Sequence, residues 1–221
     1  WIDMSDPYVT FHSKYMESVW WIIKEIYSKN LVYKGYTVQP YSPAAGSGLS
    51  SHELNQPGAY KEISDTSIVA QFKCKKDGLS NELINLYPFY FLAWTTTPWT
   101  LPSNTALTIG KRINYSFIKT YNQYTKDKIT VVLATKLVDK IFSKNFFEVK
   151  SETELNSFDK NQSKIPFLKF HELLGEDLEN INYERIWDES PLPLDNPENA
   201  FRIISGDFVT TEDGTGIVHT A

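Results

Sequence analysis

Hydroxyl and amide side chains crowd into one short stretch of the sequence. Such groups can bind a small polar molecule or a ribose, orient a water molecule for attack, or donate hydrogen bonds to a developing oxyanion. The same composition is also typical of a β-branched strand edge followed by a proline turn, because threonine is common in strands. The stretch holds Trp94, Thr95, Thr96, Thr97, Pro98, Trp99, Thr100, Pro102 and Asn104.

An apolar run leads into this stretch. Residues 89–94 are apolar and aromatic, which predicts a buried strand. Pro98 and Pro102 each lack a backbone N–H and push the preceding residue toward extended geometry, so we expect no helix here. The prediction is a strand that leaves the core and opens into a rigid loop, which the prolines and tryptophans hold in place.

A second unusual stretch stands at the end of the sequence. Residues 212–216, Glu-Asp-Gly-Thr-Gly, predict a tight turn that leads into a strand over 217–219. This strand carries His219, whose imidazole titrates near neutral pH and can orient a water molecule or transfer a proton. A single histidine on a strand usually has a structural role, so the residue type alone leaves both interpretations open.

Together the two stretches resemble a known family. Residues 95–102 resemble the threonine-rich signature of the editing domain inserted into class I isoleucyl-tRNA synthetases. Residues 212–221 resemble the Gly-Thr-Gly-x-Val-His block of the same domain. The related valyl and leucyl enzymes have an Arg-Pro pair in place of Thr97-Pro98, which favours the isoleucyl group. The start of the chain is also similar to the stretch that leads from a synthetase catalytic domain toward this insertion, at Tyr8, Tyr15, residues 17–20 and Gly35.

The resemblance implies an activity, namely hydrolysis of the ester of mischarged Val-tRNA(Ile) to free valine and tRNA. The implied partners are the 3′ end of tRNA(Ile) carrying valine and the remainder of the parent synthetase. No metal or cofactor is implied here, because the His-x-Gly-His and Lys-Met-Ser-Lys-Ser motifs for ATP and magnesium belong to the catalytic domain and are absent. The implied catalytic residues are Thr95, Thr96, Thr97 and His219, and the implied substrate-binding residues are Trp94, Trp99, Thr100 and Asn104.

One element of the family pattern is missing from this sequence. The pattern continues a short way past the histidine block to an aspartate that binds the α-ammonium of the amino acid. This sequence ends two residues after His219. Asp207 and Asp213 lie nearby but do not match the pattern, so the resemblance implies that the carboxylate lies outside this stretch or that another acid replaces it.

Composition limits the remaining possibilities. The chain has 221 residues, 41% of them hydrophobic and 14% aromatic, which is enough for one sizeable core. Its formal net charge of −5 argues against a module that grips RNA by itself, because such modules carry a basic face. If the chain acts on tRNA, we expect most phosphate contacts to come from elsewhere.

Cysteine content and hydropathy indicate the compartment. Cys74 is the only cysteine, which excludes an internal disulfide and a Cys-based zinc site. No apolar run reaches the roughly 18 residues that a membrane helix needs, and the first residues do not form a signal peptide. We therefore expect no membrane contact and a cytoplasmic location. Trp1 is an unusual natural start, so we expect a fragment of a longer protein.

Periodicity predicts an α+β fold that is mainly β. Residues 1–57 are predicted as a helical junction segment from the synthetase body, and residues 58–221 as the editing domain, with a solvated insertion at 143–165. Many short strands separated by turns favour a β-barrel-like core with flanking helices, and the family resemblance implies the same. We expect helices at 13–27 and 137–142, and strands at 66–74, 89–94, 106–109, 115–120, 129–133, 201–204, 208–211 and 217–219.

Two other functions stay open at this point. A β-barrel could hold tRNA ends or a partner domain without catalysis, although the acidic balance argues against autonomous RNA binding. The chemistry could also serve another amino acid, as in the valyl or leucyl relatives, although Thr97 in place of arginine argues against this.

Overall fold

A computed structural model describes residues 4, 5, 7–189, 191 and 196–221. The chain divides into two compact units, residues 1–63 and residues 64–221. Sequence patterns place the domain boundary between 57 and 58, and the assignment of residues 58–63 to the editing domain stays a prediction. Among the described residues, every helix is too short or too polar to cross a membrane.

The first unit contains the predicted long helix. Helix α1 (Ser13–Ser28) begins after His12 rather than after the predicted cap Ser13, and Asn30 adopts the left-handed conformation expected beyond its end. None of its residues is buried, and Trp20 and Trp21 are 70% and 62% exposed. The apolar face of α1 therefore lacks a packing partner among the described residues of this unit.

The rest of the first unit is rich in loops, as its prolines and glycines predict. A minimal hairpin of β1 (Tyr41–Ser42) and β2 (Ser47–Gly48) precedes the single-turn helix α2 (Ser51–Leu54). The Ser50 side chain accepts from the Glu53 N–H while the Glu53 carboxylate accepts from the Ser50 N–H, so α2 carries a capping box that the sequence analysis missed.

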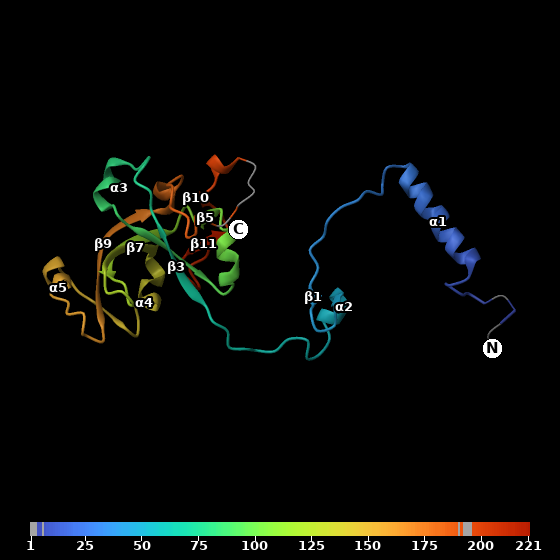
Figure 1. Cartoon of the computed structure of the whole chain (residues 1–221), viewed down its shortest axis with the longest axis horizontal. Helices are drawn as coiled ribbons and strands as arrows, with labels where there is room; N and C mark the ends of the chain where they lie inside the picture. Colours follow the sequence, from blue (N-terminus) through green and yellow to red (C-terminus); the bar gives the residue numbers. More distant parts are fainter. Residues whose placement is uncertain (1–3, 6, 190, 192–195) are drawn as a thin grey trace. The chain divides into compact units, whose positions relative to one another are not determined.

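Two open sheets make up residues 64–221 (Figure 1). The six-stranded sheet has the order β3-β4-β7-β6-β9-β8, and the three-stranded sheet has the order β10-β5-β11. The α+β class with flanking helices is confirmed. The barrel-like description is too loose, because each sheet ends in edge strands instead of closing. The strands are β3 (Ile68–Lys73), β4 (Tyr90–Thr95), β5 (Ala106–Ile109), β6 (Asn114–Tyr121), β7 (Lys128–Ala134), β8 (Phe146–Glu148), β9 (Ile165–Leu174), β10 (Arg202–Ser205) and β11 (Ile217–Thr220).

Alternation along the strands builds the main core. In β4, Phe91 and Ala93 point to one face and are fully buried, while Leu92 points to the other. The first face packs with residues of the three-stranded sheet, such as Leu107 and Ile217, into one large apolar cluster. The sheets are therefore held face to face by a shared hydrophobic core.

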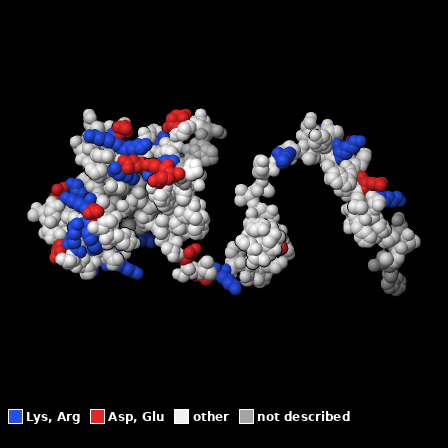
Figure 2. Space-filling model, viewed as in Figure 1, with Lys and Arg blue, Asp and Glu red and all other residues white. Residues whose placement is uncertain are grey.

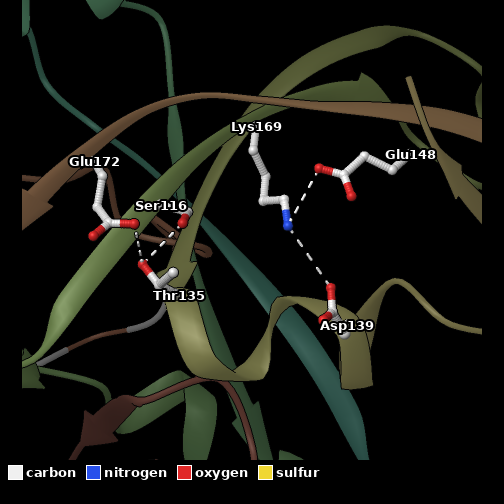
Figure 3. A network of polar contacts seen from close by, with 6 residues as sticks. All are labelled: Ser116, Thr135, Asp139, Glu148, Lys169 and Glu172. Atoms are coloured by element: carbon white, nitrogen blue, oxygen red, sulfur yellow. Dashed lines mark hydrogen bonds and ion pairs between the residues drawn. The ribbon is translucent and has the colours of Figure 1, made fainter. Parts of the chain in front are cut away.

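A short helical segment covers the opposite face of the six-stranded sheet. It consists of η2 (Thr135–Leu137) and α4 (Val138–Ile141). The Thr135 hydroxyl donates to the Glu172 carboxylate at 3.0 Å and therefore accepts from the Ser116 hydroxyl at 2.9 Å. Lys169 lies 3.8 Å from Asp139 of α4 and 3.2 Å from Glu148 (Figure 3). These contacts fasten the segment to β6 and β9, and Lys169 also joins β9 to β8.

Two predictions of local structure differ from the structure. Residues 98–103, predicted to be non-helical, form the 3₁₀-helix η1 (Pro98–Ser103). Pro98 occupies its first position, where no backbone donor is needed, and the turns use three-residue bonds such as that from the Thr100 N–H to the Thr97 carbonyl. Residues 208–211 form no strand, because the Val209 N–H turns back to the Gly206 carbonyl.

Other elements carried weak sequence signals. Helix α3 (Asn81–Leu86) and strand β9 were not predicted. A register shift between Phe117 and Ile118 of β6 interrupts the pairing with β9, and four consecutive residues of β9 are buried, so β9 lacks a strict period of two. The predicted solvated insertion at 143–165 contains β8 and helix α5 (Glu152–Asn156), which buries Leu155 completely.

The turn at residues 212–216 lies where the two sheets meet, and we call this junction the seam. Its Thr215 hydroxyl accepts from the Trp94 N–H at 3.3 Å, and its carbonyl accepts from the Ala134 N–H at 2.9 Å. Gly216 follows with φ +71°, and a Cβ at this position would overlap the Cβ of Ala134. The seam therefore requires glycine for both its backbone conformation and its close approach.

Gly216→Ala should lower the free energy of unfolding by about 2–4 kcal/mol, because left-handed strain and overpacking against Ala134 add together. Gly78→Ala is the matched control, since Gly78 has φ +80° and a Cβ there would meet nothing within 4 Å. The control should cost only about 1 kcal/mol. Urea unfolding measures both, and equal losses would contradict the importance of the Ala134 contact.

Candidate functional site

A chain of threonine hydroxyls runs from the end of β4 into η1. The Thr95 and Thr97 hydroxyl oxygens lie 3.2 Å apart, and the Thr97 and Thr100 hydroxyl oxygens lie 3.3 Å apart. The Thr97 N–H also donates to the Thr95 hydroxyl oxygen at 3.1 Å. Thr95 is buried and the other two are half-buried, so this chain forms a rigid turn at the protein surface.

The direction of these hydrogen bonds follows from one contact. The Thr100 hydroxyl donates to the Thr97 carbonyl at 2.7 Å, which uses its only proton. Its oxygen must therefore accept from the Thr97 hydroxyl and from Nε2 of His219, which lies 3.0 Å away. The Thr97 proton is then used as well, so the Thr95 hydroxyl donates to Thr97. All three hydroxyl protons have partners inside the protein.

His219 connects the second sheet to this chain. Because its Nε2 donates to Thr100, the neutral ring carries its proton on Nε2 and leaves Nδ1 as a bare acceptor. Nδ1 is buried without a hydrogen-bond partner among the described residues. Burial lowers the pKa of His219 below its ordinary value of 6.5, so the ring is neutral at physiological pH.

Thr96 differs from its neighbours. Its side chain follows the end of β4 and is exposed. Its hydroxyl has no hydrogen-bond partner in the part of the chain that the structure describes. Of the four threonines between 95 and 100, Thr96 is therefore the one whose hydroxyl can donate to a bound molecule.

Asn104 is buried beneath the site. Its amide nitrogen donates to the Ala106 carbonyl at 2.9 Å and to the Thr220 carbonyl at 3.2 Å. Its amide oxygen accepts from the Tyr183 hydroxyl at 2.6 Å. With 6% of its surface exposed and both N–H groups used, Asn104 is better placed to position β11 than to make the predicted contact with substrate.

The side chains of the two predicted tryptophans take no part in the hydrogen bonds that link Thr95, Thr97 and Thr100. Trp94 points to the opposite face of β4 from Thr95, packs over Gly214, and lines a cavity of about 340 Å³ together with Gln71 and Lys140. Trp99 is on η1 and is 68% exposed. The structure thus brings together Thr95, Thr97, Thr100 and His219, whereas Trp94 braces the turn at the seam.

Asp207 and Asp213 lie near the histidine block in the sequence, but neither matches the aspartate of the family pattern. Asp213 forms an ion pair with Lys140, which also donates to the Glu212 carbonyl. Asp207 is exposed beyond the end of β10. Neither carboxylate contacts His219 or the threonine chain. Among the described residues, no three His, Cys, Asp or Glu side chains gather where they could hold a metal ion.

Sequence reasoning missed two residues that shape this site. Thr215 was seen only as part of a tight turn, yet its hydroxyl and carbonyl join the two sheets. Tyr183 carried no signal, because its hydroxyl partner Asn104 lies 79 residues away in the sequence. Only the buried contact shows its role.

Comparison with known proteins gives a consistent family. A model described as class I tRNA synthetases (I, L, M and V) matches residues 1–182. The whole chain is similar to the isoleucine–tRNA ligases of Bacteroides fragilis and Cytophaga hutchinsonii, both at 51% identity, and of Clostridium tetani at 41%. It spans 18%, 19% and 17% of their lengths, roughly a fifth of the curated relatives it matches.

Two solved structures show weaker similarity. The crystal structure of GlLeuRS-CP1 is 16% identical, with a TM-score of 0.45 over 70% of this chain and 52% of that chain. The editing domain of the P. knowlesi cytosolic leucyl-tRNA synthetase is 9% identical, with a TM-score of 0.43 over 69% and 57%.

The lowered pKa of His219 makes the stability of the fold depend on pH. Between the lowered value and 6.5, the unfolded chain binds more protons than the folded chain, so the free energy of unfolding falls as the pH falls through this window. His219→Gln should flatten this dependence, because glutamine can still donate to Thr100 but does not titrate.

Urea unfolding at about pH 7.5 and about pH 5 measures the effect. His52→Gln, which removes an exposed histidine of the first unit, is the control and should keep the wild-type dependence. An unchanged pH dependence in His219→Gln would show that another group is responsible.

Proposed function

The chain belongs to the class I tRNA synthetase family of the isoleucine, leucine, methionine and valine enzymes, and we propose that it is the editing domain of an isoleucine–tRNA ligase. Its reaction is hydrolysis of the ester of Val-tRNA(Ile). The observation that carries the proposal is the 3.0 Å contact between Thr100 and His219. It joins the two motifs of the sequence, 119 residues apart, into one surface site.

A hydrolytic site of this kind meets a physical need. A pocket gains only about 1–3 kcal/mol from one methylene, and the isoleucyl enzymes themselves are the usual illustration of this limit for valine. A second site that destroys the smaller product supplies the missing accuracy. Such a site must admit valine, exclude isoleucine and place water on the ester carbonyl.

The accounting of hydroxyl protons divides these tasks among the threonines. Thr96 has a free, exposed hydroxyl and donates to the oxyanion that develops on the ester carbonyl. The Thr97 oxygen accepts from Thr95 and keeps one lone pair, with which it orients the attacking water. The Thr95 and Thr100 hydroxyls hold this geometry and touch no substrate.

His219 acts through position and shape in this proposal. Its Nε2 is engaged by Thr100 and its Nδ1 is buried, so neither nitrogen is open to a water molecule in this structure. The half-buried His219 ring, with its nitrogens turned inward, can form one wall of the pocket for the amino acid through its carbon edge. In the hydrolysis itself, the water oxygen bonds to the carbonyl carbon, the ester C–O bond breaks, and the proton released by water passes through solvent to the ribose oxygen.

Binding of the tRNA depends on more than this chain. On the face shown in Figure 2, basic and acidic side chains of residues 64–221 lie interspersed rather than forming one basic surface. The net charge of −5 points the same way. We therefore propose that the remainder of the parent synthetase supplies most phosphate contacts, with the apolar face of α1 packing against it, and that the protein works in the cytoplasm.

Deacylation of Val-tRNA(Ile) and Ile-tRNA(Ile) tests the function. The chain should hydrolyse the valyl ester selectively and leave the isoleucyl ester largely intact. Thr120→Val is the control and should keep the activity, because the buried Thr120 hydroxyl donates to the Pro166 carbonyl rather than to any group of the threonine stretch. If neither the chain nor the parent enzyme hydrolyses either ester, the proposal is wrong and the domain is a binding module for tRNA ends or a partner domain.

The division of roles among the threonines gives a sharper prediction. Thr96→Val should lower kcat about 100-fold with little change in the urea midpoint, because the lost hydroxyl has no hydrogen-bond partner among the residues that the structure describes. Thr95→Val should lower both kcat and the urea midpoint, since the Thr97 N–H would lose its acceptor. Equal activity losses with equal stability losses in the two variants would refute this division.

A further inference from the structure

The site is divided between two sheets. Thr95 and η1 continue from β4 of the six-stranded sheet, whereas His219 belongs to β11 of the three-stranded sheet. The distance between Thr100 and His219 therefore depends on how the end of β11 is held against η1. Strand β5 begins at Ala106, shortly after η1, and pairs with β11, so the hydrogen bonds and packing at this junction fix the distance.

Asn104 supplies the direct link. It follows η1 immediately, and its amide donates to the carbonyl of Thr220, the residue after His219. The Thr105 N–H donates to the same carbonyl at 2.8 Å. The orientation of the Asn104 amide is fixed from the other side, because its oxygen accepts from the Tyr183 hydroxyl and both of its N–H groups face carbonyls.

Tyr183 is anchored to both sheets. Its N–H donates to the Phe201 carbonyl next to β10 at 2.9 Å, and the following Glu184 N–H donates to the Lys73 carbonyl of β3 at 2.7 Å. Its fully buried ring makes edge-to-face contacts with Phe72 and Phe201, at centroid distances of 5.3 Å and 6.2 Å. The hydroxyl therefore approaches Asn104 from a frame that cannot easily shift.

We propose that Tyr183 is a positioning residue of the hydrolytic site, whose hydroxyl orients the Asn104 amide and thereby holds His219 against Thr100. The inference rests on the proposed deacylase function for its kinetic consequence, but the geometric claim stands by itself. Burial raises the pKa of Tyr183, so its hydroxyl stays protonated and donates throughout the working pH range.

Tyr183→Phe removes the hydroxyl and keeps the ring. Without its donor, the Asn104 amide can rotate away from the Thr220 carbonyl, which then keeps only the Thr105 N–H, and the end of β11 loosens. We expect kcat for Val-tRNA(Ile) to fall about tenfold with KM little changed, because the fault lies in the alignment of the site rather than in tRNA binding. In an Asn104→Ala background, the same substitution should have no further effect.

Tyr121→Phe is the matched control. It also removes a tyrosine hydroxyl that bonds a carbonyl, that of Leu155 in the peripheral helix α5, away from the threonine chain. It should keep the wild-type kcat. Urea unfolding of both variants establishes that they are folded at the assay temperature.

A second readout does not need activity. The imidazole of His219, followed by NMR titration, should show a higher midpoint in Tyr183→Phe than in the wild type, because a loosened strand end lets water reach the ring. Tyr121→Phe should not move it. If neither the wild-type chain nor the parent enzyme is active, the deacylase proposal fails and this titration alone decides. A folded Tyr183→Phe variant with the wild-type titration midpoint overturns the positioning role.

Discussion

The joint between the two sheets depends on the polar groups of Thr215. Its hydroxyl and carbonyl accept the Trp94 and Ala134 N–H groups, at the point where β4 and β7 stop pairing with each other. Backbone donors that are buried without partners are costly, so this turn has to lie against both strands. The position of β11, and with it His219, follows from that requirement.

In the threonine stretch, the hydrogen bonds of the hydroxyl protons distinguish structural threonines from the one that can bind a substrate. Thr95, Thr97 and Thr100 satisfy one another, and the shared direction of their bonds fixes the tautomer of His219. A hydroxyl that is already satisfied gains little by turning to a ligand. The abundance of threonine in the motif therefore reflects mainly the construction of the turn, and one free hydroxyl is left for binding.

Sequence patterns predicted well whatever depends on local order. The period of two in β3 and the helix before Asn30 were both visible, because the residues concerned are neighbours in the sequence. Features that depend on distant partners were not visible. Strand β9 lacks regular alternation, and Tyr183 acts on a residue far away in the sequence. The rule that proline disrupts helices predicted no helix at residues 98–103, although Pro98 and Pro102 are compatible with the 3₁₀-helix η1.

The open edges of the six-stranded sheet have a consequence for association between chains. An unpaired strand edge can add a strand from a neighbouring molecule, and long, flat edges do so most readily. Strand β8 is only three residues long, and residues 182–184 bond to the chain at Lys73–Lys75, which covers one end of β3. The segment that carries Tyr183 therefore also shortens the template on which aggregation could begin.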